Sequence, residues 1–79
     1  MSWNYRITRK STPNGPYFAI HEVYYDKEDR AYAITENPSY PSGETPEGLR
    51  EDLMMMKMDA TKRSVIDYDS VPEPGAVSP

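Results

Sequence analysis

The sequence predicts an α+β domain with the element order β-β-β-α-β, in which a four-stranded mixed sheet carries one helix on one face. Three observations lead to this prediction. Three runs of strand-forming residues precede residue 37, one helical segment with a clear start covers residues 45–60, and a short apolar run follows it. A single helix in a domain with several strands must bury its apolar stripe against the sheet that those strands form.

The first strand is predicted over residues 3–9. Trp3, Tyr5 and Ile7 alternate there with polar residues, which is typical of a strand with one face on a core. Residues 11–16 contain two prolines, an asparagine and a glycine, so we expect a loop after this strand.

The second and third strands are predicted to form a hairpin. Residues 17–25 are rich in aromatic and β-branched types, and the polar residues 26–29 connect them to a third strand at 30–36. The alternation of the second strand breaks near His21 and Glu22, where we expect a β-bulge.

The helix start is the best defined local feature. Thr45 is a good N-cap, Pro46 suits the first helical position, and Glu47 places negative charge near the positive end of the helix dipole. At 100° per residue, four apolar side chains lie within about 60° of one another and predict the sheet-facing side. These are Leu49, Leu53, Met56 and Ala60.

The chain after the third strand completes the predicted domain. Residues 37–44 form a loop to the helix, and residues 64–68 form a fourth strand. A right-handed helical crossover places this strand parallel to the first strand and beside it. We predict a single domain over residues 1–69 and a flexible C-terminal tail over residues 70–79, which are rich in proline.

Composition excludes several classes of function. The chain has 79 residues, no cysteine, one histidine and a net charge of -4, so thiolate zinc sites, disulfides and a general affinity for anionic polymers are not expected. The sequence has neither the apolar run of a signal peptide nor a stretch long enough to cross a bilayer. We therefore expect a cytoplasmic protein with no membrane partner.

The helix carries more methionine than its sheet-facing side requires. Met54 and Met58 point away from that side, and Met55 lies between them and its edge. One interpretation is that these side chains widen an apolar stripe over an irregular sheet. The other is that Met54, Met55 and Met58 form a contact surface for a second copy or a different protein.

Candidate catalytic groups are few, and we expect no cofactor. His21 and Glu22 are adjacent in a strand, so their side chains point to opposite faces unless a bulge redirects one. Carboxylates from four elements offer a possible oxygen-ligand site for Mg²⁺ and phosphoryl transfer. These are Glu22, Glu36, Asp52 and Asp67.

Aromatic and basic residues raise a further alternative. Seven tyrosines favour a sheet face without a covering helix, on which single-stranded nucleic acid would stack. Arg6, Arg9 and Lys10 lie close together, and solvated charges at a strand end are the favoured interpretation of this group. The acidic net charge argues against nucleic acid as the partner.

Residues 42–53, Ser-Gly-Glu-Thr-Pro-Glu-Gly-Leu-Arg-Glu-Asp-Leu, resemble the segment of HicB-like antitoxin domains in which a glycine and a threonine cap precede an acidic amphipathic helix. The predicted strand order is also similar to the partial RNase H-like fold of that family. This resemblance implies binding of a small toxin protein and no catalysis.

Taken together, these features predict a small, non-enzymatic protein-interaction module. A homodimer through the methionine side of the helix or through an exposed strand edge is the expected assembly. The alternatives are the single-stranded nucleic-acid binder and the carboxylate-dependent metal enzyme.

Overall fold

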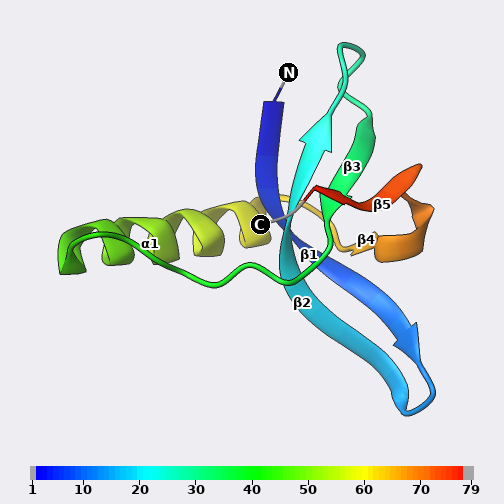
Figure 1. The fold of residues 1–79 in the computed structure, drawn as a ribbon, viewed down its shortest axis with the longest axis horizontal. Coiled ribbons are helices and arrows are strands. Elements are labelled where there is room, and N and C mark those ends of the chain that lie inside the picture. The colour runs from blue at the N-terminus through cyan, green and yellow to red at the C-terminus, as the bar shows by residue number, and fades with distance from the viewer. Residues whose placement is uncertain (1, 78–79) are drawn as a thin grey trace.

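The computed structural model describes residues 2–77 and has the predicted α+β class and β-β-β-α-β order, with two further elements at its end (Figure 1). The elements are β1 (Ser2–Thr12), β2 (Gly15–Tyr25), β3 (Ala31–Thr35), α1 (Pro46–Lys62), β4 (Ile66–Asp67), the 3-10 helix η1 (Tyr68–Ser70) and β5 (Glu73–Val77).

The sheet is mixed and has the strand order β4-β1-β2-β3-β5. The pairs β1–β2 and β2–β3 are antiparallel, whereas β4 runs parallel to β1, with Thr8 opposite Ile66. The predicted crossover through α1 is therefore confirmed, because it returns the chain beside the first strand in the parallel sense. The predicted four strands form the part β3-β2-β1-β4 of this sheet.

The β1–β2 hairpin is longer and more regular than predicted. Ser11 pairs with Pro16 and Thr12 with Gly15, so the loop predicted at residues 11–16 is wrong apart from its two turn residues. Gly15 has a φ of 111°, a value that only glycine adopts freely, and this allows so tight a reversal.

The bulge predicted in the second strand is misplaced. The register of β1 and β2 runs without interruption through His21 and Glu22, which face Arg6 and Tyr5. The irregularity lies instead between Tyr24 and Tyr25 in the pairing with β3. The mixed alternation of β2 has a different cause. At residues 20–25 both faces of the strand are at least partly covered and each takes apolar residues, whereas Tyr17 and Phe18 are exposed.

The predicted flexible tail over residues 70–79 is wrong for its described part. Val71 is buried in the core, and β5 pairs in parallel with the outer edge of β3, with Ala33 opposite Glu73. The prolines of this segment suggested disorder, but an edge strand tolerates proline because the missing N–H can face outward. The folded unit thus extends beyond residue 69, and residues 78 and 79 lie outside the described residues.

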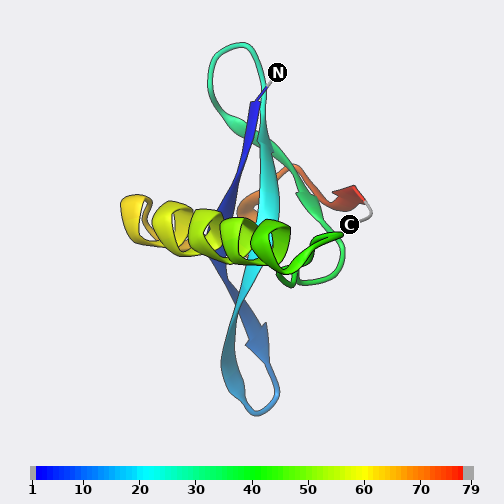
Figure 2. The ribbon, with the colours of Figure 1, turned by 90° about the vertical axis from the view of Figure 1, so that its left-hand side faces the viewer.

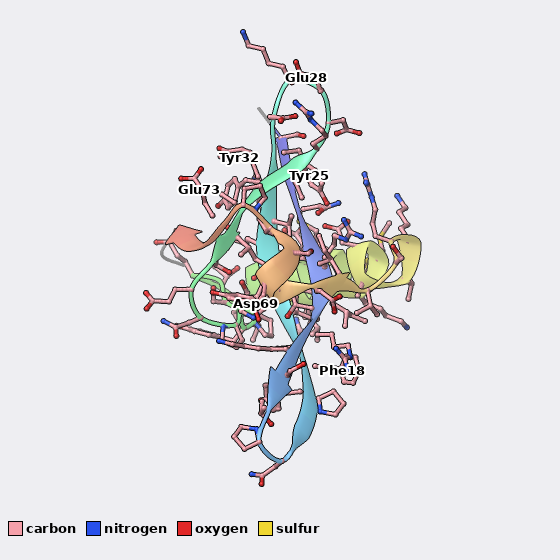
Figure 3. The ribbon with its side chains drawn as sticks, turned by 90° about the vertical axis from the view of Figure 1, so that its right-hand side faces the viewer. Phe18, Tyr25, Glu28, Tyr32, Asp69 and Glu73 are labelled. Carbon is pink, nitrogen blue, oxygen red and sulfur yellow. The ribbon has the colours of Figure 1, made fainter. Side chains whose placement is uncertain are left out.

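The main apolar core lies on the face of the sheet opposite α1. Its buried members come from β2, β3, η1 and the segment after η1, and Figures 1 and 3 show the C-terminal segment on the side of the β1–β2 ribbon away from the helix. They are Val23, Tyr25, Ile34, Tyr68 and Val71. The second face of the sheet is therefore covered, and the open tyrosine face on which the nucleic-acid alternative rests is occupied by protein.

Candidate functional site

Two hydrogen bonds from one residue of β1 join helix α1 to the sheet. The Tyr5 hydroxyl donates a hydrogen bond to Asp52 Oδ1 (2.8 Å), and the Tyr5 backbone N–H donates to Asp59 Oδ2 (3.2 Å). Between these two carboxylates, Met56 is the one buried residue of the helix. Asp52, Met56 and Asp59 follow one another at spacings of four and three, so they define the side of α1 that faces the sheet.

The predicted sheet-facing side of the helix is therefore partly wrong. Met56 is buried as predicted, but Leu49 and Leu53 are exposed. The prediction assumed that the inward side is the apolar one, whereas here two carboxylates turn inward to reach Tyr5. The sequence feature that could have indicated these inward carboxylates is the pair Asp52 and Asp59, which lie seven residues apart on either side of Met56.

The start of α1 is confirmed by its cap. The Thr45 Oγ1 accepts a hydrogen bond from the backbone N–H of Gly48 (3.0 Å), and the Ser42 backbone N–H donates to Asp52 Oδ2 (3.0 Å). Gly43 packs directly on the first turn, since a Cβ at this position would lie 2.5 Å from the backbone nitrogen of Leu49. The loop before the helix is thus folded back onto it.

The methionine surface, defined here as Met54, Met55 and Met58, faces away from the sheet. These side chains are 63%, 47% and 49% exposed. In Figures 1 and 2, α1 crosses the β1–β2 ribbon and extends beyond it, and its main contacts with the sheet are made with β1. The interpretation in which these methionines fill gaps over the sheet is therefore not supported, whereas their role in binding a partner remains a prediction.

A pocket of about 520 Å³ lies between α1, the sheet and the loop after β3. It is lined by Tyr5, Glu22 and Asp52 together with loop residues that include Tyr40. Both carboxylates already accept hydrogen bonds, because the Tyr24 hydroxyl donates to Glu22 Oε1 (2.6 Å) and Tyr5 donates to Asp52. Burial and the Glu22 acceptor raise the pKa of Tyr24 to about 12, so this donor remains protonated at neutral pH.

The four carboxylates of the metal-site alternative do not come together. Glu22 and Asp52 line the pocket beside α1, Glu36 lines a separate pocket on the other face, and Asp67 lines a third with its partner Arg9 at 3.7 Å. Among residues 2–77, no group of three or more histidine, cysteine or acidic side chains has an arrangement that would hold a metal ion.

His21 is a buried core residue on the face opposite α1. It is 5% exposed, its Nδ1 lies 3.0 Å from the backbone oxygen of Thr35, and its ring packs against Tyr68 with centroids 5.2 Å apart. Burial lowers the pKa of His21, and the nearby Lys10 adds to this effect. A neutral imidazole with Nδ1–H donating to Thr35 fits this environment, as expected for a satisfied histidine, and the predicted divergence from Glu22 is confirmed.

The basic residues near the first strand are engaged within the fold. The Arg6 guanidinium donates to the backbone oxygen of Ser64 (3.0 Å), Arg9 pairs with Asp67, and the Lys10 ammonium lies 4.7 Å from the centre of the Tyr68 ring. These contacts fit the interpretation of local charges at a strand end better than that of a cationic patch.

Comparison with protein-family models, with curated proteins and with solved structures finds no match to this chain. In the described part of the chain, no helix has the length and apolar character needed to cross a membrane.

Proposed function

We propose that this chain is a small, non-enzymatic protein-interaction module that docks a polypeptide on the methionine surface of α1. The observation that carries the proposal is the exposure of the helix. Met56 is the one buried residue among the 17 residues of α1, while five large apolar side chains of the same helix are exposed. These are Leu49, Leu53, Met54, Met55 and Met58.

Helix formation alone does not require methionine at these positions. Lysine, glutamate and glutamine have nearly the same helix propensity as methionine, and they are soluble when exposed. Full burial of one methionine side chain contributes about 1.5 to 3 kcal/mol, which is large beside the stability of roughly 5 to 15 kcal/mol of a typical domain. A partner that covers Met54 and Met58 would therefore stabilise this fold considerably.

The chemistry of methionine fits this role. Its side chain is unbranched and polarizable, so it adapts to the shape of an opposing surface better than a branched side chain does. Protein binding without catalysis is also what the resemblance of residues 42–53 to HicB-like antitoxin domains implies. We propose a cytoplasmic location as well, because a small domain without cysteine lacks the disulfides that commonly brace secreted domains of this size.

The proposal is tested by expressing three tagged chains in cells, applying a reversible cross-linker, and purifying each chain by its tag. The polypeptides that each tagged chain retains are then compared. The chains are the wild type, the double variant Met54→Lys, Met58→Lys, and the control Phe18→Lys. Phe18 is 54% exposed and lies on the hairpin arm, away from α1 (Figure 3). We expect the wild type and the control to retain a polypeptide, either another protein or an untagged copy, that the double variant loses. Identical recovery with all three chains would refute the proposal.

A further inference from the structure

We propose that the polypeptide docked on α1 is a second copy of this chain, and that the two α1 helices pack antiparallel about a two-fold axis between Met54 and Met55. This inference rests on the proposed function and names its partner. It comes from the charged residues that flank the methionine surface on the same side of the helix.

The methionine surface is the middle of a longer exposed stripe, which we call the α1 stripe. At 100° per residue, six exposed side chains lie within about 100° of one another, roughly 115° from the side that faces the sheet. They are Glu47, Glu51, Met54, Met55, Met58 and Lys62.

The α1 stripe is complementary to itself when reversed. Its acidic residues, Glu47 and Glu51, occupy the N-terminal end of the helix, and Lys62 occupies the last turn. Glu47 and Lys62 are equally distant from the midpoint between Met54 and Met55. A two-fold axis at this midpoint therefore sets Glu47 of each copy opposite Lys62 of the other and Met54 opposite Met55 in the centre, with Met58 opposite the aliphatic stem of Glu51.

The parallel arrangement is unfavourable for the same residues. It would set Glu47 against Glu47 and Lys62 against Lys62, and it would align the two helix dipoles in the same direction. Like charges that face one another across an interface act against that arrangement. The antiparallel arrangement instead pairs opposite charges at both ends and opposes the dipoles.

The methionine surface is not covered by the rest of the fold. α1 extends beyond the β1–β2 ribbon, as Figure 2 shows from the side of the helix, and Met54, Met55 and Met58 are all exposed. The stripe also has the anatomy of a protein interface, with adaptable apolar side chains in the centre and charged side chains at the rim.

Single cysteines test this geometry cleanly, because the wild-type chain has none. In the antiparallel dimer, Glu47→Cys of one copy lies opposite Lys62→Cys of the other. Two copies of the same variant instead place their thiols about 22 Å apart along the helix, at a rise of about 1.5 Å per residue. A disulfide requires Cα atoms within about 7 Å of each other.

Under mild oxidation, we expect a mixture of the two variants, one carrying a size tag, to form the heterodimeric disulfide several-fold faster than either variant forms its homodimer. Met55→Cys, next to the axis, should form a homodimer. Phe18→Cys, at another exposed position, measures the background of random collision. The antiparallel inference is supported if the mixture exceeds this background and neither Glu47→Cys alone nor Lys62→Cys alone does.

The contrary outcomes separate this inference from the proposed function. If Glu47→Cys alone forms the homodimer faster than the mixture forms the heterodimer, the helices are parallel and the inference is wrong, while docking on the methionine surface stands. If all variants remain at background but the wild type retains a different protein after cross-linking in cells, the partner is not a second copy. If the wild type retains nothing, both proposals are wrong.

Discussion

The Tyr5 hydroxyl donates a 2.8 Å hydrogen bond to Asp52 Oδ1, and this contact joins the first strand to the helix 47 residues later in the chain. The same tyrosine donates its backbone N–H to Asp59, so one strand residue supplies two of the hydrogen bonds that orient α1. Because Asp52 and Asp59 turn inward to reach Tyr5, the methionine surface turns outward. The proposed docking surface is thus a consequence of how Tyr5 holds the helix.

The contact between Tyr5 and Asp52 predicts a loss of stability in Tyr5→Phe. The substitution leaves the carboxylate of Asp52 without its side-chain donor, and a hydrogen bond to a charged group contributes about 1.5 to 3 kcal/mol. We expect a loss in that range, measured by chemical denaturation at pH 7. Because Asp52 keeps its hydrogen bond from Ser42, the fold itself should persist. An unchanged free energy of unfolding would contradict this role of Tyr5.

Alkaline pH should destabilise the wild type more than Tyr5→Phe. Burial, and then the hydrogen bond to Asp52, raises the pKa of Tyr5 above its usual value of 10.0, and burial raises those of Tyr24 and Tyr68 as well. The folded state therefore binds more protons than the unfolded state above about pH 10. The stability that these protonated tyrosines contribute is complete below that pH and falls as the pH rises above it. The measurement is the free energy of unfolding between about pH 9 and pH 11, roughly one unit on either side of the usual tyrosine pKa. It should fall less steeply for Tyr5→Phe than for the wild type.

Thr45→Ala should destabilise the protein by about 1 kcal/mol, because the N–H of Gly48 loses its acceptor at the helix start. Thr61→Ala is the matched control. The Thr61 hydroxyl donates to the backbone oxygens of Lys57 and Met58, a contact that helices do not need, so this variant should be nearly neutral. Equal denaturation midpoints for the two variants would show that the cap contributes no stability.

Substitution by alanine should change the stability of the protein in opposite directions at two glycines that lie close together, Gly43 and Gly48. In Gly43→Ala the new Cβ would lie 2.5 Å from the backbone of Leu49, so the loop must move off the helix and stability should fall by more than 1 kcal/mol. In Gly48→Ala the new Cβ meets Thr45 Oγ1 at 3.4 Å, an ordinary contact, and the helix gains about 0.5 to 1 kcal/mol. Thermal unfolding of both variants beside the wild type measures the two signs, and a stabilised Gly43→Ala would contradict the close approach.

Mild acid should destabilise the wild type through His21. Burial lowers its pKa below the usual 6.5, so the unfolded state binds a proton that the folded state excludes. The stability is complete above about pH 6.5 and falls as the pH drops toward the lowered value in the folded state. His21→Gln, which keeps a donor for Thr35 and does not titrate, should lose less stability between about pH 7 and pH 5. Parallel pH profiles for the two proteins would show that His21 titrates normally.

The sequence predicted what local patterns determine. Thr45, Pro46 and Glu47 place the start of the helix within a few residues, and the alternation around Tyr5 identifies the first strand, so the four-stranded order and the crossover follow. Fold class and helix boundaries therefore needed no tertiary information.

The errors arose where a distant contact overrides a local pattern. Val71 stands among prolines and is buried only because β2, β3 and Tyr68 form a core beneath it. Asp52 and Asp59 are typical exposed helix residues by composition, and only the position of Tyr5 turns them inward. The outward direction of Met54 and Met58 was predicted from the helical angles, but the exposure of Met55 was not. The self-complementary arrangement of the α1 stripe became evident only when the sheet-facing side was known.

The most direct test of the central claim, that the methionine surface docks another copy of the chain, is sedimentation velocity over a concentration series. The wild type and Phe18→Lys should shift from monomer toward dimer as concentration rises, whereas Met54→Lys, Met58→Lys should remain monomeric with the same helix content. A dimer that persists unchanged in the double variant would place the interface elsewhere. A wild type that remains monomeric at roughly millimolar concentration, where association of about 4 kcal/mol becomes visible, would contradict the claim.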